Sequence, residues 1–364
     1  MPVFMDYHFL PGLTIEDVKK AHLADKQLQE KYQVEFLQLW VNKEAGTIFS
    51  LIDAPNKQAC SDIHQEAHGA IACNVIDVDP GLVYFLMGDD KYLQHGIVHT
   101  SRGDIDTGYR YILCIDITSK TDTDIPIFSR RLTETITAQG IATSIISENN
   151  GKKLENIGEE GIIAVFEKAD EVMECALELH EVFASKVDAA EWNLEFSLGI
   201  NYGPPVTMEE GLFSESVAYA KYLSLMANHR EILVPGIFTK TGFFDKLCTD
   251  CKKVKVITER DQHFVQNFFR QVEKHFSDEG FSLSILCSEI GVSRAQLYRK
   301  VMKVTGRSPG IFIRCLKMHR ALSLIREENL NISEIALEVG YNNPSYFSKC
   351  FQERFGIMPS KVIS

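Results

Sequence analysis

The feature that most constrains this chain is an internal repeat in its C-terminal tail, residues 261–364. Both copies place a small residue four positions before a glycine: Cys287 and Gly291 in the first, Ala336 and Gly340 in the second. With one extra residue in the second copy, further positions match in type: Leu297 with Phe347, Arg299 with Lys349, Gly306 with Gly356, and Pro309 with Pro359. Each copy predicts two helices joined by a tight glycine turn, and such a duplication is hard to obtain by chance.

The residue types of both copies suit a helix-turn-helix, whose second helix enters the major groove of DNA. Glycine permits the turn, and the small residue before it lets the two helices cross closely. The outward side chains of the second helices are polar or basic, which are types that read base edges or hold phosphates. We expect DNA contacts from Arg294, Gln296, Arg299, Ser345, Tyr346 and Lys349. The alternative is a plain helical bundle with solvated Arg and Lys, which the duplication disfavours.

Charge is divided unevenly between this tail and the rest of the chain. The net charge of −12 at pH 7 would by itself argue against nucleic-acid binding. Residues 261–364, however, carry 14 Lys and Arg against 10 Asp and Glu, a net +4, whereas residues 1–260 carry 24 against 40, a net −16. We therefore expect the tail to meet double-stranded DNA and the acidic remainder to have a different role.

Three motifs of the tail resemble the AraC/XylS family of bacterial transcription regulators. They are Ile335-Ala336-x-x-Val339-Gly340-Tyr341, Ser345-Tyr346-Phe347-Ser348-Lys349-x-Phe351 and Phe355-Gly356-x-x-Pro359. The resemblance implies two helix-turn-helix subdomains joined by a central helix near residues 308–327, with the recognition helices in successive turns of major groove. Ala295 and Pro344 stand where larger polar side chains often contact bases in that family, so the operator cannot be read from the residues.

Residues 1–80 alternate between strand and helix patterns in the order βαββαβ. Strands are predicted at 3–9, 34–41, 47–52 and 74–78, and helices at 14–31 and 56–68. This order indicates a ferredoxin-like sandwich. Residues 81–108 begin apolar and then become rich in glycine and aspartate, and we predict an irregular connector there.

Four histidines of this first segment are candidate metal ligands. His64 and His68 are four residues apart, so a helix would place both on one face, within reach of one ion. His8 on the first strand and His22 on the first helix complete the set. Imidazole donors suit Ni, Cu, Zn or Fe(II), and the alternative is that these are ordinary surface and core histidines.

The same segment resembles a small family of nickel-binding ferredoxin-like proteins, sometimes fused to cyclase-like domains. The matching stretches are Phe4-Met5-Asp6-x-His8, Ala21-His22-x-x-Asp25, Asp53-Ala54-Pro55 and His64-x-x-Ala67-His68-Gly69. The resemblance implies a divalent transition metal as cofactor, nickel first. A cysteine common on the third strand of that family is replaced here by Phe49 or Ser50, which removes a thiolate ligand, and Cys60 and Cys73 are the other thiols of the segment.

The middle of the chain predicts a second α/β unit. Strands are expected near 111–118, 161–166 and 194–200, and helices near 127–139 and 170–186. Three stretches resemble the class III nucleotide cyclases: Cys114-Ile115-Asp116-Ile117-Thr118, Ile157-Gly158-Glu159-Glu160-Gly161 and Gly199-Ile200-x-x-Gly203.

In the cyclase family two carboxylates hold the catalytic metal ions, and the resemblance puts Asp116 and Glu159 at their positions. The Asn and Arg that orient the ribose and stabilise the transition state would fall near Ala218 and Tyr222, so both are missing. We therefore expect a non-catalytic relic that binds a ligand or mediates dimerisation, with a plain spacer as the alternative.

Together the patterns predict an α+β protein of three domains. These are a ferredoxin-like, metal-binding domain over residues 1–88, a cyclase-like α/β domain over 108–257, and an all-α AraC-type domain with two helix-turn-helix subdomains over 261–364. No apolar run is long enough to cross a bilayer, no signal peptide is expected, and nine scattered cysteines favour the cytoplasm. Cys248-x-x-Cys251 lacks the second pair that a zinc site needs.

The prediction for the whole chain is a cytoplasmic transcription regulator of AraC type, without enzymatic activity, in which an acidic sensory body sets the DNA affinity of the tail. A metal or small-molecule effector and a homodimer fit this organisation, and a membrane partner does not. Two other classes remain open, a nucleotide cyclase and a metal-buffering protein, each carrying a DNA-binding appendage.

Overall fold

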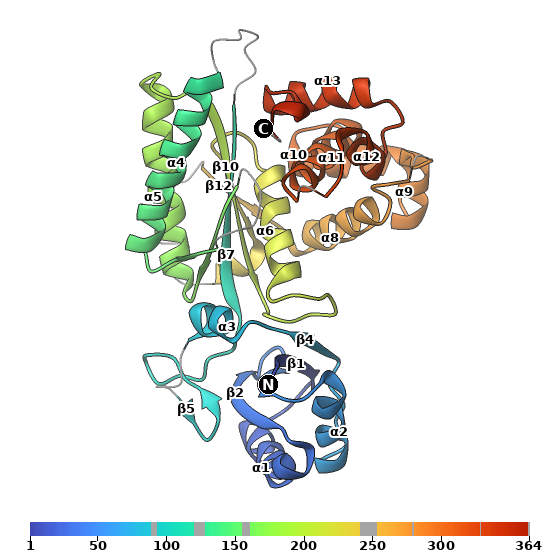
Figure 1. Ribbon diagram of the computed structural model, residues 1–364. Coiled ribbons are helices and arrows are strands. Elements are labelled where there is room, and N and C mark those ends of the chain that lie inside the picture. Colours follow the sequence, from blue (N-terminus) through green and yellow to red (C-terminus); the bar gives the residue numbers. More distant parts are fainter. Residues whose placement is uncertain are drawn as a thin grey trace. The chain divides into compact units, whose positions relative to one another are not determined.

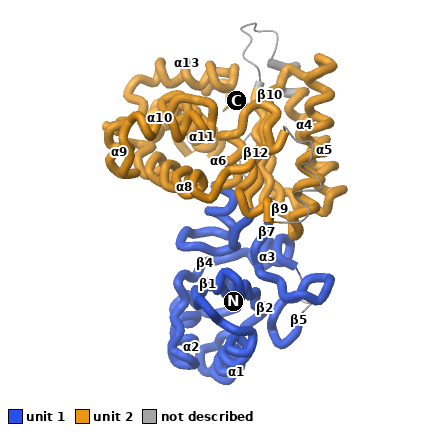
Figure 2. The backbone as a smooth tube through the Cα atoms, turned by 180° about the vertical axis from the view of Figure 1, so that it is seen from behind, with its two compact units in different colours: residues 1–111, 202–218 blue, residues 112–201, 219–364 orange. Residues whose placement is uncertain are grey.

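The computed structural model describes residues 1–88, 93–119, 128–154, 161–240, 253–278, 280–327 and 329–362. The chain forms two compact units, residues 1–111 with 202–218 and residues 112–201 with 219–364 (Figure 2). The second unit holds most of the middle α/β segment together with the helical tail. In the described part of the chain, no helix has both the length and the apolar character to span a membrane.

The first unit is built on a six-stranded sheet with the strand order β4-β1-β3-β2-β6-β5. Its strands are β1 (Val3–Phe9), β2 (Glu35–Asn42), β3 (Thr47–Asp53), β4 (Asn74–Asp77), β5 (Leu93–Gln94) and β6 (Ile97–Val98). Helices α1 (Ile15–Tyr32) and α2 (Lys57–Ala67) contact each other and pack on one face of the sheet (Figure 1). The predicted βαββαβ order of residues 1–80 is confirmed, with ends shifted by one or two residues.

Local capping sets where these two helices begin. The Thr14 hydroxyl accepts a hydrogen bond from the backbone N–H of Asp17, whose carboxylate accepts one from the N–H of Thr14. Asn56 caps α2 by accepting from the N–H of Ala59. Beneath the helices lies an apolar cluster that joins both layers, made of Phe4, Val34, Phe36, Ile52, Ala54, Ala59, Cys60 and Ile63.

The segment predicted as an irregular connector contains a helix. Residues Pro80–Met87 form α3, which is capped by the side chain of Asp79. The prediction was wrong here because a short, uniformly apolar run has no polar face from which a helical period can be read. Beyond it, β5 and β6 add a short hairpin to the sheet.

The second unit has its own six-stranded sheet, in the order β12-β11-β10-β7-β9-β8. The strands are β7 (Arg110–Ser119), β8 (Lys152–Lys153), β9 (Ile162–Phe166), β10 (Leu194–Gly203), β11 (Ile232–Pro235) and β12 (Val254–Ile257). Helices α4 (Phe128–Glu148) and α5 (Ala169–Asp188) cover one face, and α6 (Ser214–Met226) lies on the other (Figure 1). Helix α6 approaches β10 closely: a Cβ added at Gly199 would stand 2.2 Å from the backbone nitrogen of Ser224.

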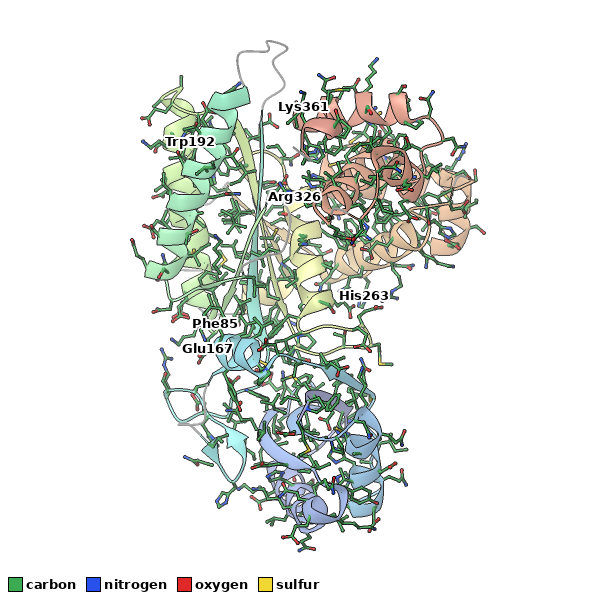
Figure 3. The ribbon with its side chains drawn as sticks, in the orientation of Figure 1. Phe85, Glu167, Trp192, His263, Arg326 and Lys361 are labelled. Atoms are coloured by element: carbon green, nitrogen blue, oxygen red, sulfur yellow. The ribbon has the colours of Figure 1, made fainter. Side chains whose placement is uncertain are left out.

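The tail is helical throughout its described residues, as its periodicity predicts. It comprises α8 (Glu259–Lys274), α9 (Leu283–Ile290), α10 (Arg294–Thr305), α11 (Pro309–Arg326), α12 (Ile332–Glu338), α13 (Pro344–Phe355) and the short η4 (Pro359–Lys361). The repeated turns have left-handed glycines, Gly291 at φ 73° and Gly340 at φ 72°. The predicted pair of helix-turn-helix subdomains is confirmed, and Figure 3 marks Arg326 at the end of the helix α11 that joins them.

Each helix-turn-helix has a separate apolar core. The first contains Leu286, Leu297 and Phe312, and the same cluster includes Met226 of α6 and Leu233 of β11. The second is built from the later part of α11 together with α12 and α13, with the members Met318, Ala321, Leu322, Leu324, Ile325, Ile335, Ala336, Val339, Phe347, Cys350, Phe351 and Phe355. Helix α11 therefore belongs to both cores.

Candidate metal centre and nucleic-acid interface

Five polar side chains meet between β1 and the two helices of the first unit. Side chains alternate along a strand, so Asp6 and His8 share the helix-covered face of β1. At the centre stands His64 of α2, whose Nε2 lies 2.8 Å from Oδ2 of Asp6 and whose Nδ1 lies 3.1 Å from Oδ1 of Asp25 on α1. Nε2 of His8 lies 3.2 Å from Asp6, and Nε2 of His68 lies 3.1 Å from Asp25. We call these five residues the imidazole–carboxylate cluster.

The cluster holds opposite charges close together, and all its members except the exposed His68 are buried. Burial by itself would lower the pKa of His64, but its hydrogen bonds to Asp25 and Asp6 raise that pKa to about 10. Burial opposes ionisation of Asp6, yet His8 and His64 hold the pKa of its carboxyl well below the usual range. The pKa of Asp25 is lowered likewise by His64 and His68. At neutral pH the metal-free cluster is therefore an imidazolium between two carboxylates.

The donors of the cluster fit a transition metal. They form two overlapping groups, Asp6 with His8 and His64, and Asp25 with His64 and His68, and within each group the ligand atoms lie within 4.8 Å of one another. His64 belongs to both groups and offers a different ring nitrogen to each. A metal on one nitrogen leaves the other to donate to a carboxylate, which is how proteins commonly orient a metal-bound histidine. Imidazole and carboxylate ligands suit Ni²⁺, Zn²⁺ and related ions.

His22, the fourth predicted ligand, is in neither of these groups. Its ring is buried and packs edge-to-face on Phe36, with centroids 5.7 Å apart. Neither ring nitrogen has a hydrogen-bond partner among the described residues. Burial lowers the pKa of His22 to about 4, so the ring is neutral. The structure thus brings together His8, His64 and His68 and leaves His22 in the apolar surroundings of the cluster.

Asp6 and Asp25 are the members that reasoning from histidines missed. Both aspartates are part of the quoted motifs, and their spacing from a neighbouring histidine indicates that they share a face with it. Asp6 precedes His8 by two residues, which on a strand means the same face. Asp25 follows His22 by three residues, which on a helix also means a shared face.

The third-strand position at which the resembling family often has a cysteine lies beside the cluster. Ser50 pairs with Asp6 in the register of β1 and β3, and its backbone N–H donates to Oδ1 of Asp6 at 2.9 Å. The neighbouring Phe49 lies on the opposite face of the sheet. Of the two other thiols, Cys60 is buried, which raises its pKa to about 12, and Cys73 is exposed.

The second helices of the two helix-turn-helix copies present their predicted DNA contacts to the outside. All six side chains are exposed: Arg294, Gln296 and Arg299 on α10, and Ser345, Tyr346 and Lys349 on α13. Leu297 and Phe347, at matched positions of the repeat, are buried on the opposite side. The Gln296 carboxamide oxygen accepts from the N–H of Ser293 at 2.9 Å and so caps α10.

The cyclase-like positions have partners of their own. Oδ2 of Asp116 on β7 accepts a hydrogen bond from Nη2 of Arg354 on α13 at 3.3 Å. Ala218 and Tyr222 lie on α6, and the Tyr222 ring stacks on Phe269 of α8 with centroids 3.6 Å apart. Glu159 and the Cys248-x-x-Cys251 motif lie outside the described residues.

Two family models match separate parts of the chain. Residues 286–364 match a helix-turn-helix domain, and residues 4–78 match the family described as nickel responsive protein SCO4226-like. The C-terminal part is accordingly a helix-turn-helix domain of AraC type. The N-terminal part is a SCO4226-like domain, in agreement with the resemblance that its motifs indicated.

Curated relatives match this chain in short stretches. The lactose operon transcription activator of Staphylococcus xylosus is 30% identical over 109 residues, which are 30% of this chain and 37% of that protein. The regulator GbdR of Pseudomonas aeruginosa is 35% identical over 82 residues, 22% of each chain. Histidine kinase P4 of Formosa agariphila is 36% identical over 105 residues, 29% of this chain and 8% of that protein. The chain therefore spans well under two thirds of these relatives.

Solved structures resemble the two ends of the chain. The crystal structure of SCO4226 from Streptomyces coelicolor A3(2) is 32% identical and covers 21% of this chain and 94% of that one, with a TM-score of 0.20. The C-terminal domain of AraT, a response regulator from Geobacillus stearothermophilus, is 29% identical and covers 28% of this chain and 83% of that one, with a TM-score of 0.26.

Proposed function

We propose that this chain is a sequence-specific DNA-binding transcription regulator whose N-terminal domain binds a divalent transition metal, nickel first, and that this metal sets its affinity for DNA. The observation that carries the proposal is the pair of recognition helices, α10 and α13, each with three exposed polar side chains opposite a buried core residue. The helix-turn-helix match and the named transcription regulators among the relatives support it. A homodimer acting in the cytoplasm is the form we expect.

The metal half of the proposal rests on the imidazole–carboxylate cluster and on the match to a nickel-responsive family. Only a neutral imidazole coordinates a metal, so an ion that binds His64 must displace the proton which Asp6 and Asp25 hold there. Metal binding therefore releases a proton, and the apparent affinity falls as the pH is lowered. The bound ion would join β1 to α2, or α1 to α2, according to which nitrogen of His64 it takes.

We also infer that the middle segment does not form cyclic nucleotides. Three observations support this: Ala218 lacks a polar group, Tyr222 is stacked on Phe269, and Asp116 is hydrogen-bonded to Arg354. The remaining rival is a metal-buffering protein, in which metal binding would leave the affinity for DNA unchanged.

The test uses the full chain, stripped of metal, and DNA fragments that it selects from a bacterial genome. Gel-shift titrations without metal, with nickel and with zinc should show an affinity that changes by about 5- to 150-fold with nickel, the usual range of allosteric coupling. His64→Ala should abolish the change, whereas His263→Ala, an exposed histidine on α8 (Figure 3), should not.

The outcomes separate the two halves of the proposal. If the affinity for DNA is equal without metal, with nickel and with zinc, the chain binds DNA but metal does not control it, and the metal half of the proposal is wrong. Binding that shows no sequence preference under any condition would overturn the regulator itself. Arg299→Ala should weaken binding by roughly 1–3 kcal/mol if that side chain contacts a guanine.

A further inference from the structure

We propose that Asp116 is a positioning residue that fixes the second helix-turn-helix subdomain relative to the first, and thereby sets the spacing of the two DNA half-sites that the chain reads together. The first subdomain is α8 to α10 with the beginning of α11, and the second is the end of α11 with α12 and α13. The inference rests on the proposed DNA binding and adds to it a residue that lies outside the recognition helices.

The joint between the two subdomains lies within α11. Phe312 and Leu316 of this helix belong to the first core, and from Met318 onward its buried side chains belong to the second. The first core also contains Met226 and Leu233, so the first subdomain is fixed to the sheet layer. Bending of α11 near Leu316 would therefore move α13 while α10 stays in place.

Arg354 connects its own helix α13 to β7 and to α11 at this joint. It lies in the last turn of α13, and its Nη2 donates to Oδ2 of Asp116 on β7 at 3.3 Å. The same Nη2 lies 2.9 Å from Nε2 of His319, one turn after Leu316 on α11. The charge of Arg307, which follows the end of α10, partly offsets the rise in the pKa of Asp116 that burial causes, and Nη1 of Arg307 donates to the backbone oxygen of Leu225 at 3.2 Å. Asp116 on the sheet is therefore hydrogen-bonded to an arginine of the second subdomain and influenced by the charge of an arginine of the first.

Both partners of this contact are less exposed than those of a surface ion pair. The Asp116 side chain is 12% exposed and that of Arg354 is 21% exposed. If α13 moved away, the Asp116 carboxylate would stay buried without its hydrogen-bonded cation, which is unfavourable. The contact therefore favours the position of α13 in which Arg354 reaches Asp116. The turn at Gly340, where an added Cβ would stand 2.7 Å from the backbone oxygen of Phe276, supports the second subdomain at its other end.

A fixed second recognition helix has a consequence for DNA. Once the first helix is bound, the second meets its half-site at a high effective concentration, provided that the half-site stands at the matching distance. A second helix that moves on α11 loses part of this advantage and accepts other distances. Spacing, rather than the affinity for one half-site, is the property that Asp116 controls.

The experiment measures binding of the full chain to its selected DNA site and to versions with one base pair inserted or deleted between the half-sites. The wild type should lose about tenfold or more in affinity on either change of spacing. Asp116→Asn and Arg354→Gln should each bind the original site about three- to tenfold more weakly and should distinguish the spacings less than the wild type does. Binding to an isolated half-site should stay the same.

Further variants separate positioning from simple loss of structure. Gln352→Ala is the matched control, because Gln352 is an exposed residue of α13 two positions before Arg354. It should keep the wild-type response to spacing, and Arg354→Lys should restore part of that response. The double variant Asp116→Asn with Arg354→Gln should behave like either single one, because both remove the same contact.

Three results would overturn the proposal. One is a wild-type response to spacing in Asp116→Asn and Arg354→Gln proteins with unchanged melting temperatures. Another is tighter binding by both variants, which would make the contact inhibitory. The third is a wild type that binds no DNA, which would remove the proposed function as well; the first two leave it intact.

Discussion

Each unit buries an aspartate beneath a helix or strand layer, and the two carboxyls respond to burial in opposite ways. Asp6 has His8, His64 and the N–H of Ser50 around it, and its pKa is lowered. Asp116 has Arg354 as its hydrogen-bonded cation, and burial raises its pKa despite that partner. The cost of burial is similar in kind, so the difference lies in how many donors compensate it. The surroundings of Asp6 favour its ionised form, which can bind a metal, whereas those of Asp116 make ionisation less favourable than in water.

The largest expected effect is on the first unit when Asp6 is neutralised. Asp6→Asn leaves His64 and His8 without their shared anion, and we expect the unit to lose about 3–5 kcal/mol of unfolding free energy. The two tryptophans allow each unit to be followed alone: Trp40 is buried in the first and Trp192 lies in the second (Figure 3). Urea unfolding of Trp192→Phe protein reports the first unit. A loss of unfolding free energy below 1 kcal/mol would mean that neutralising Asp6 costs no more than neutralising Asp116.

The second expected effect is a loss of stability at alkaline pH. The folded pKa of His64 is raised to about 10, so its contribution is complete below the unfolded value near ~6.5 and disappears as the pH rises through about 10. The metal-free first unit should therefore lose on the order of 3 kcal/mol between pH 7 and pH 10.5. His64→Gln should flatten this dependence in urea unfolding followed at Trp40. An equal slope in both proteins would show that His64 is not protonated at pH 7.

Metal should sharpen the contrast between the units. At a hundredfold excess of free nickel over its dissociation constant, the first unit should gain about 2.7 kcal/mol by mass action. The gain should shrink toward pH 5, because His64, whose pKa is raised to about 10, must lose a proton to bind the ion. Thermal melts followed at each tryptophan will show whether the gain is confined to the first unit. His68→Ala distinguishes the two donor groups, since the group of Asp6, His8 and His64 does not need it.

The smallest effect is expected from neutralising the other aspartate. Asp116→Asn removes a carboxylate that is already costly to ionise in the folded protein, so the second unit should change by no more than about 1 kcal/mol. Because the folded pKa of Asp116 is raised, its charge lowers stability above the unfolded pKa, and mild acid relieves that cost. Trp192 fluorescence of Trp40→Phe protein measures the change. A loss above 3 kcal/mol would mean that Asp116 is as well compensated as Asp6.

The sequence predicted most where its patterns are periodic. The duplicated glycine turns identified both helix-turn-helix copies, and the strand–helix alternation identified four of the six strands of the first sheet to within a residue or two. The helix predicted at 127–139 runs on to Glu148, because Gly140 resembles a helix end although Ala142, Ile145 and Ile146 continue its buried face. Helix α3 was missed for the opposite reason, since its residues are nearly all apolar.

Contacts between distant elements were beyond any local pattern. The imidazole–carboxylate cluster required β1, α1 and α2 to be placed together, and three of the four predicted histidines and both carboxylates then met. The pairing of Asp116 with Arg354 joins residues 238 positions apart. Neither residue carries a local signal for the other, because an ion pair depends on how whole elements pack and not on spacing along the chain.

The continuous core beneath α8 has a consequence for protein engineering. Phe269 of that helix stacks on Tyr222 of α6, and its neighbour Phe268 is buried in the same cluster as Leu233 of β11. A cut near residue 258, the natural choice for transplanting the DNA-binding tail onto another sensor, would bare this aromatic face to water and invite aggregation. A working chimera would have to carry α6 and the adjoining strands with the tail, because Phe268 and Phe269 also pack on Phe312 of the first helix-turn-helix core and cannot be made polar without damaging it.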